Sequence, residues 1–302
     1  MALHTKKLYY RRGGTTYSID LYTTTAEVGA EYISLRDGST TVYAKIDAVG
    51  SANESFLRVR KSGISKSIIS IASPIELSSL LKYDFSNTSC YPGSGTAVTN
   101  IGTGGALNAT LTNGVGFSST NGGILTFDGV DDYIMLTTRV TVPLSEGTIS
   151  IWYNPTSWTP SGNGEYIWCA GGAPFSGGTF HWIGAHPAYS TNLCFGVFHT
   201  EAHRIAAHTS APTVGNWHHV IGAWGTFGIK IAVNGYYTGS NSNINWSYYG
   251  STTDTPYEYL GTGGNPGTGA VCTIGGFKVF NTALTDAQVL NEFNATKARF
   301  GL

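Results

Sequence analysis

The sequence predicts an all-β protein made of a small antiparallel β-domain and a larger two-sheet β-sandwich. Charged residues make up only 12% of the chain, which contains 40 glycines and 13% aromatic residues, a composition typical of strands joined by many turns. The apolar fraction of 41% excludes a disordered chain. Residues 214–237 predict a β-hairpin with two apolar faces, and such a sheet must be covered on both sides.

The hairpin at 214–237 is the clearest strand signal. Side chains alternate along a strand, so Trp217 and His219 share one face, while Val220 and Trp224 share the other. Glycines between the two strands let the chain reverse. The stretch contains no Asp or Glu, so we expect core strands here and place any binding in the loops around them.

The N-terminal part predicts a small antiparallel β-domain of about six strands. Residues 8–21 and 57–70 are similar at an offset of 49 positions, and each predicts a strand, a basic glycine turn and a second strand. Between these repeats, Asp37 and Gly38 provide a strong hairpin signal.

The two parts of the chain differ in charge. Residues 1–83 hold 11 Lys and Arg against 7 Asp and Glu, a net charge of +4, whereas residues 84–302 hold 6 against 11, a net charge of −5. All seven tryptophans lie in the second part. We therefore expect two domains, at 1–75 and 76–302, with the link between residues 72 and 83.

Five basic residues near the predicted turns of the first domain are its candidate assembly residues: Arg11, Arg12, Arg58, Arg60 and Lys61. They predict either a solvated face or a docking surface for an acidic partner protein. Nucleic acid is not expected, because a charge of +4 is modest and no nucleic-acid-binding motif accompanies it.

The second domain predicts short strands between loops rich in Gly, Asn and Ser. Besides the hairpin, we expect strands within 123–136 on either side of a turn at 128–132, and at 147–153, 165–168, 179–183, 192–198, 204–208, 257–260 and 271–280. The chain ends in a helix, because Thr285 and Gln288 match a capping box and Val289, Leu290 and Phe293 form an apolar stripe.

The hydropathy and cysteine patterns argue against a secreted protein, a membrane-spanning protein and a cysteine metal site. The N-terminus lacks the apolar run of a secretory signal peptide, and no stretch approaches a membrane span. The four cysteines show no metal-ligand spacing, so we expect them to be free and buried. A disulfide between Cys169 and Cys194 is the alternative.

A set of short motifs in the second domain resembles a known family. The motifs lie at 89–95, 125–129, 132–133, 149–152, 217–220, 233–235 and 280–285. Together they resemble the concanavalin A-like lectin/glucanase superfamily, and more narrowly the laminin-G-like jelly-roll domains of phage and bacterial surface proteins. The resemblance covers residues 83–302 and implies a jelly-roll β-sandwich with a C-terminal helix.

This resemblance implies a non-enzymatic structural or adhesion protein of a virus particle, of the fibre, spike or capsid-decoration type. The implied partners are other virion structural proteins, sister copies in a homo-oligomer and a cell-surface glycan, with no nucleic acid and no membrane insertion. The implied location is the particle surface, on capsid or tail, after assembly in the host cytoplasm. The alternatives are a decoration or filament subunit without a glycan ligand and a glycan hydrolase.

Catalytic motifs are missing from the second domain. Jelly-roll glucanases carry a Glu-x-Asp-x-x-Glu pattern on one strand, and this chain has none. The nearest acidic group, Asp128, Asp131 and Asp132, lies in a predicted turn, where these residues fix the backbone. Calcium binding by Asp131 and Asp132 is the alternative, and no other cofactor is expected.

Aromatic and histidine side chains in the predicted loops and strands are the candidate carbohydrate-binding residues. They are Trp158, Trp182, His186, Tyr189, Trp246, Tyr248 and Tyr249. Aromatic rings can stack on the apolar faces of sugars. Packing in the sandwich core or in a subunit interface is the alternative for each of them.

Overall fold

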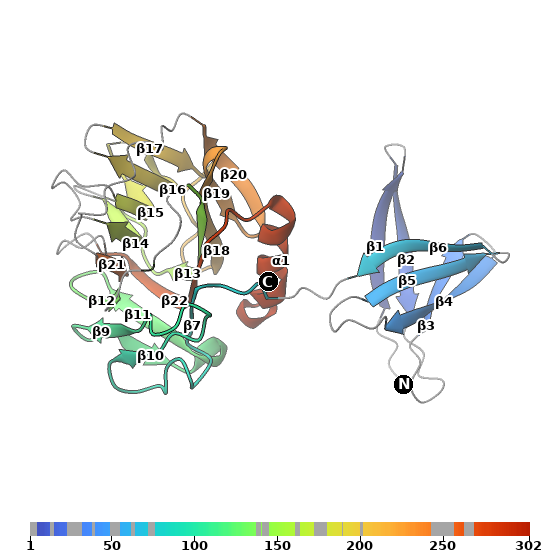
Figure 1. Cartoon of the computed structure of the whole chain (residues 1–302), viewed down its shortest axis with the longest axis horizontal. Coiled ribbons are helices and arrows are strands. Elements are labelled where there is room, and N and C mark those ends of the chain that lie inside the picture. The colour runs from blue at the N-terminus through green and yellow to red at the C-terminus, as the bar shows by residue number, and fades with distance from the viewer. Residues whose placement is uncertain are drawn as a thin grey trace. The chain divides into compact units, whose positions relative to one another are not determined.

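The chain forms two compact units, Met1–Ile75 and Glu76–Leu302 (Figure 1). The computed structural model describes, in the first unit, the strand backbones at 5–12, 15–22, 32–37, 40–48, 55–61 and 64–71. In the second it describes residues 76–136, 140, 145–160, 164–171, 180–188, 190–199, 202–242, 257–262 and 269–302.

The first unit is built from antiparallel hairpins. Strands β1 (Thr5–Arg12) and β2 (Thr15–Tyr22) pair with each other. Strands β3 (Tyr32–Asp37), β4 (Thr40–Ala48), β5 (Ser55–Lys61) and β6 (Ile64–Ile71) form a second sheet in chain order. Both repeats are therefore hairpins, as predicted.

The basic residues of the first unit lie in strands, which corrects their assignment to turns. Arg11 and Arg12 are the last two residues of β1, opposite Thr16 and Thr15. Arg58, Arg60 and Lys61 belong to β5 and pair with residues of β6. The basic pattern suggested turns at these positions, whereas the strands extend through them.

The second unit contains two antiparallel sheets. The first sheet has the order β10-β11-β22-β13-β18-β19-β20, with β7 also paired to β22, and the second has the order β17-β16-β15-β14-β21-β12-β9-β8. The strands of the first sheet are β7 (Leu81–Asp84), β10 (Gly116–Ser118), β11 (Ile124–Asp128), β13 (Gly147–Pro155), β18 (His218–Gly225), β19 (Gly228–Val233), β20 (Tyr236–Asn241) and β22 (Val271–Phe280). Those of the second are β8 (Ala97–Val98), β9 (Ala109–Thr112), β12 (Tyr133–Leu136), β14 (Glu165–Gly171), β15 (Phe180–His186), β16 (Ser190–His199), β17 (Ala202–Ala207) and β21 (Tyr257–Leu260).

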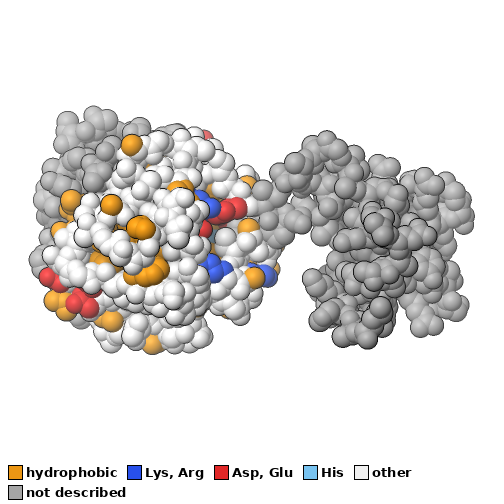
Figure 2. All heavy atoms as spheres, turned by 90° about the horizontal axis from the view of Figure 1, so that it is seen from below, with side chains coloured by type: hydrophobic (Ala, Val, Ile, Leu, Met, Phe, Trp, Pro, Cys, Tyr) orange, Lys and Arg blue, Asp and Glu red, His pale blue; other side chains and the backbone are white. Residues whose placement is uncertain are grey.

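The main core lies between the two sheets. Ile151 and Phe277 project from the first sheet, Trp168 and Phe195 from the second, and each is at most 1% exposed. This arrangement confirms the predicted jelly-roll sandwich. On the face shown in Figure 2, charged side chains of the described residues are few, in keeping with the low charge of the sequence.

The β18–β19 hairpin is covered on both faces, as predicted. Val220 and Trp224 lie in the core between the sheets. On the outer face of the first sheet, Ile221 and Ala232 pack against Val289 of helix α1 (Asp286–Thr296). The second cover is therefore the C-terminal helix (Figure 1).

Helix α1 begins with the expected capping box. The Gln288 side chain accepts a hydrogen bond from the Thr285 backbone N–H at 2.9 Å, and the Thr285 hydroxyl accepts one from the Gln288 N–H. The chain continues through a 3₁₀ turn, η3 (Lys297–Phe300), and stops at Gly301 with φ of 78°. Among the described residues, no helix has both the length and the hydropathy needed to cross a membrane.

All four cysteines are free and buried, as expected, so the alternative of a Cys169–Cys194 bridge is wrong. Burial raises the pKa of the Cys194 thiol to about 11. A thiol with so high a pKa is protonated at neutral pH and therefore unreactive.

Candidate functional site

One member of the sequence-predicted aromatic site, Trp182, lies in the interior of the protein. Trp182 is fully buried and packs with Tyr166, Cys169 and Cys194 on the second sheet. An indole without exposed area offers no face to a sugar, so the binding role predicted for Trp182 is corrected to packing. Its alternation with the core residue Ile183 places it on the other face of β15, and that face is covered as well.

The remaining predicted aromatic and histidine residues divide into two groups. Trp158 is partly buried against the core, and its Nε1 donates a hydrogen bond to the Thr191 carbonyl oxygen at 2.9 Å. His186 is 8% exposed, and burial lowers the pKa of its imidazole. Tyr189, Trp246, Tyr248 and Tyr249 lie outside the described residues.

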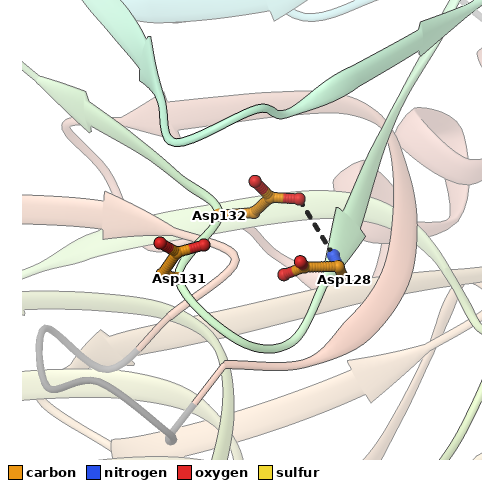
Figure 3. Close-up of side chains that lie close together, drawn as sticks. All are labelled: Asp128, Asp131 and Asp132. Carbon is orange, nitrogen blue, oxygen red and sulfur yellow. Dashed lines mark hydrogen bonds between the residues drawn. The ribbon is translucent and has the colours of Figure 1, made fainter.

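Three carboxylates converge in the turn between β11 and β12 (Figure 3). Oxygens of Asp128, Asp131 and Asp132 lie within 4.8 Å of one another. An Asp132 oxygen accepts a hydrogen bond from the Asp128 N–H at 3.1 Å, and Asp128 accepts one from the Val130 N–H at 2.8 Å. These bonds shape the turn as predicted, and a set of hard oxygens also fits a calcium ion, which Asp131 and Asp132 would hold together with Asp128.

Two other carboxylates are buried near the ends of strands. Glu165 accepts a hydrogen bond from the Thr159 N–H at 3.0 Å, and burial raises the pKa of its carboxyl to about 7. Glu258 accepts a hydrogen bond from Trp168 Nε1 at 3.0 Å. Glu165 is 7% exposed and Glu258 is 3% exposed, so both carboxyl groups lie in the interior and not on a surface that a sugar could contact.

A serine–histidine pair lies beneath helix α1. Ser150 Oγ is 2.7 Å from His219 Nε2, and the His219 ring stacks on Trp152 with centroids 4.7 Å apart. His219 is 1% exposed, and burial, with the nearby charge of Lys278, lowers the pKa of its imidazole to about 3. The pair has the composition of a nucleophile and its base, but Phe293 of helix α1 stacks on the His219 ring, and Ser150 and His219 are only 3% and 1% exposed. The cavity that the pair shares with residues of the helix measures about 30 Å³, which is too small for a sugar.

An open groove lies on the same sheet, at the end of β13 and just before β18. Its volume is about 360 Å³, and its lining residues are Thr120, Asn121, Ile124, Asn154, Pro155, Thr156, Val214, Gly215, Trp217 and Thr273. The sheet order places β11, β22, β13 and β18 side by side and thereby brings these distant segments together.

The groove combines one large aromatic ring with short polar side chains. Trp217 is only partly buried, and Val214 is 49% exposed. The Asn154 amide donates a hydrogen bond to the Gly215 carbonyl oxygen at 3.1 Å, which ties the loop before Trp217 to β13. Such a lining can stack on an apolar face and hydrogen-bond to hydroxyl groups.

Sequence reasoning missed this groove, because Trp217 belongs to the hairpin that we expected to be core. The missed signal was the position of Trp217 just before the strand, next to Val214, Gly215 and Asn216. A tryptophan at the junction between a polar loop and a strand can lie at the rim of a sandwich, whereas one in mid-strand is buried.

Comparison with known proteins places the fold. The family model for the "Concanavalin A-like lectin/glucanases superfamily" matches residues 128–290. Domain 4 of AbnA, an extracellular arabinanase from Geobacillus stearothermophilus solved with arabinotriose, is similar with a TM-score of 0.55 and 17% identity, over 72% of this chain and 99% of that chain. Trypanosoma rangeli sialidase in complex with sialic acid is similar with a TM-score of 0.51 and 9% identity, over 98% of this chain and 53% of that chain. The chain thus spans about half of the sialidase, and comparison with curated proteins gives no match.

Proposed function

This chain belongs to the concanavalin A-like lectin/glucanase superfamily, and from that premise we propose that its second unit binds carbohydrate without cleaving it. The observation that carries the proposal is the groove around Trp217. It offers an aromatic face beside amide and hydroxyl side chains, and none of its described lining residues is a carboxylate. This lining supports binding, whereas glycoside hydrolysis needs two carboxyl groups flanking the bond.

The comparison with the arabinanase supports the binding half of the proposal. The similar region is a whole domain, since 99% of that chain is covered, and that domain was solved with a trisaccharide. A sandwich of this fold can therefore hold a sugar without an attached catalytic domain. The likeness supports a carbohydrate as ligand, and the position of the ligand rests on the groove alone.

The positions of five other described carboxylates, two in the interior and three in a turn, support the non-enzymatic half. Glu165 and Glu258 are buried and accept hydrogen bonds from neighbouring groups, and the three aspartates lie in a turn. The sealed Ser150–His219 pair does not supply a nucleophile either, because a covered hydroxyl cannot attack a substrate.

We further propose the setting in which this binding acts: adhesion of a virus particle to cell-surface glycan. The first unit would anchor the protein to other virion proteins or sister copies through its basic strands. Many copies on one particle would convert weak single contacts into firm attachment. The purely structural alternative makes the opposite prediction, namely that neighbouring copies cover the groove in the assembled particle.

The experiment is a binding measurement with Trp217→Ala in the full chain. We expect the natural protein to bind members of a panel of neutral and acidic oligosaccharides, arabinotriose included, in calorimetry. Loss of a central aromatic contact costs about 2 kcal/mol, so the variant should bind about thirtyfold more weakly.

The matched control is Tyr236→Ala, which removes an aromatic ring that is 64% exposed on β20 and does not line the groove. It should bind like the natural protein. Absence of binding to every sugar of the panel, or equal affinity of Trp217→Ala and the natural protein, would overturn the proposal.

A further inference from the structure

Among the described residues that line the groove, none is charged. These ten residues carry apolar, hydroxyl or amide side chains, or are glycine. The part of the chain that contains it, residues 84–302, has a net charge of −5. An acidic sugar would bring its charge into a site whose described lining offers no cationic side chain, within a part of the chain that is negatively charged, and this costs free energy.

Phe300 supports the aromatic ring of the groove from behind. Its ring centroid lies 4.4 Å from that of Trp217 and 4.3 Å from that of Trp152, and the residue is 6% exposed. A β-carbon at Gly275 would lie 2.5 Å from the Phe300 ring, so only glycine leaves room for it there. The Trp217 ring is therefore held by a packed neighbour that does not line the groove.

Arg299 supports the amide wall of the groove. Its Nε donates to the Asn121 carbonyl oxygen at 2.6 Å, and Nη2 donates to the Gly123 carbonyl oxygen. In return the Asn121 amide donates to the Arg299 carbonyl oxygen at 3.1 Å. Nη1 lies 2.8 Å from a carboxylate oxygen of Asp84, so the charge of the guanidinium is matched outside the groove.

The segment fixed by Arg299 needs this support. Asn121 has φ of 52°, in the left-handed region that few residues other than glycine and asparagine adopt. Two backbone carbonyls accepting from one guanidinium fix the turn at η1 (Thr120–Gly122). Without Arg299 the amide of Asn121 would have to be ordered when the ligand binds, and that ordering would lower the affinity.

From these contacts we propose that the groove selects uncharged sugars and that Arg299 and Phe300 are its positioning residues. They fix Asn121 and Trp217 from behind and do not touch the ligand. This inference rests on the proposed function, because it specifies the ligand class and the support of the same groove. Two consecutive residues of the C-terminal turn thus set both the stacking surface and the hydrogen-bonding wall.

The first experiment separates positioning from packing. Phe300→Leu removes the ring behind Trp217. Phe293→Leu is its matched control, since the Phe293 ring stacks on Trp152, whereas the Phe300 ring contacts both Trp152 and Trp217. Both variants lose one aromatic contact with Trp152. We expect about a three- to tenfold loss of affinity for a neutral oligosaccharide with Phe300→Leu only. Phe300→Tyr, which keeps the ring, should restore the affinity.

The second experiment addresses Arg299. Arg299→Met should weaken neutral-sugar binding by about three- to tenfold and speed amide exchange at 120–124. Lys82→Met is the matched control, because it removes a cation that pairs with Glu76 at 2.7 Å and does not line the groove. It should leave affinity and exchange unchanged.

The outcomes distinguish this inference from the proposed function. If the natural protein binds no sugar, the proposed function fails, and the amide exchange of 120–124 in Arg299→Met still tests the support. If neutral sugars bind but Phe293→Leu weakens them as much as Phe300→Leu, the positioning role is wrong. Tighter binding of sialylated or uronic acid oligosaccharides than of neutral ones would overturn the ligand class.

Discussion

Strands β13 and β18 present two halves of one outer face, and the halves differ in what covers them. Under helix α1, Ser150 and His219 lie 2.7 Å apart and are sealed. Beyond the helix, Asn154 and Trp217 line an open groove. Both halves combine an aromatic or imidazole ring with a short polar side chain, so residue type does not distinguish them. The element that covers a sheet therefore decides which part of the sheet can bind a ligand.

A buried ion pair holds helix α1 on the sealed half of the face. We expect that breaking this pair lowers the stability of the protein more than any other change proposed below. Lys278 Nζ lies 2.6 Å from Glu292, which is 1% exposed, and 2.7 Å from Glu76. In Lys278→Met the Glu292 carboxylate stays buried without its cation. We expect the free energy of unfolding to fall by about 3 kcal/mol in urea denaturation. In the folded variant the sugar affinity of the groove should be unchanged.

Two further variants test the contribution of the Lys278–Glu292 pair to stability. Lys82→Met removes a lysine whose side chain is 20% exposed and pairs with Glu76. It should lower the free energy of unfolding by less than about 1 kcal/mol. The double variant Lys278→Met with Glu292→Leu replaces both charges and should recover much of the loss. If Lys278→Met proves as mild as Lys82→Met, helix α1 is not held by this pair.

Acid should act on the sealed half through His219. Its pKa is about 3 in the folded protein, chiefly because of burial, against about 6.5 when unfolded. Its neutral form therefore stabilises the fold fully above about pH 6.5, and this contribution is lost as the pH falls towards 3. Between pH 7 and pH 5 the loss is about 2 kcal/mol.

His219→Asn isolates that contribution. Urea denaturation of both proteins at pH 7 and pH 5 compares the stability lost on acidification, and other titrating groups cancel in the difference. The natural protein should lose about 2 kcal/mol more than His219→Asn. An equal loss in the two proteins would show that His219 is not buried in its neutral form.

The Asp128 turn differs from the groove in charge, because it carries three carboxylates whereas the described lining of the groove is neutral. If its three carboxylates hold calcium, the ion at about ten times its dissociation constant should add about 1.4 kcal/mol of stability, seen as a higher Tm. Asp131→Asn and a chelator should each abolish the increase. The sugar affinity of the groove should be the same with and without calcium. A natural protein whose Tm ignores calcium contradicts the metal assignment.

Much of the fold could be predicted because local patterns carry it. The alternation from Val220 to Trp224 and the Thr285–Gln288 capping box depend on near neighbours in sequence, and both were confirmed. The cover over Ile221 and Ala232 followed from their apolar character, although its identity as a helix did not.

The groove could not be predicted in the same way. Asn121, Asn154, Trp217 and Thr273 meet only because β11, β22, β13 and β18 are neighbours, and strand order is not written in local alternation. Trp182 and Trp217 are both tryptophans beside a histidine. Only the tertiary structure shows that one is covered and the other lines an opening.

The position of β22 in the first sheet also determines when this sheet can form during translation. This strand lies between β11 and β13 and also pairs with β7, yet it is the last strand to be made. A ribosome adds roughly 5–20 residues per second, so β7, β11 and β13 wait between roughly six and forty seconds for their central partner. During that interval the edges of β11 and β13 that will face β22 are unpaired on the nascent chain. The first sheet can therefore be completed only once β22 is made, and helix α1, which covers its outer face, follows β22 directly in the chain.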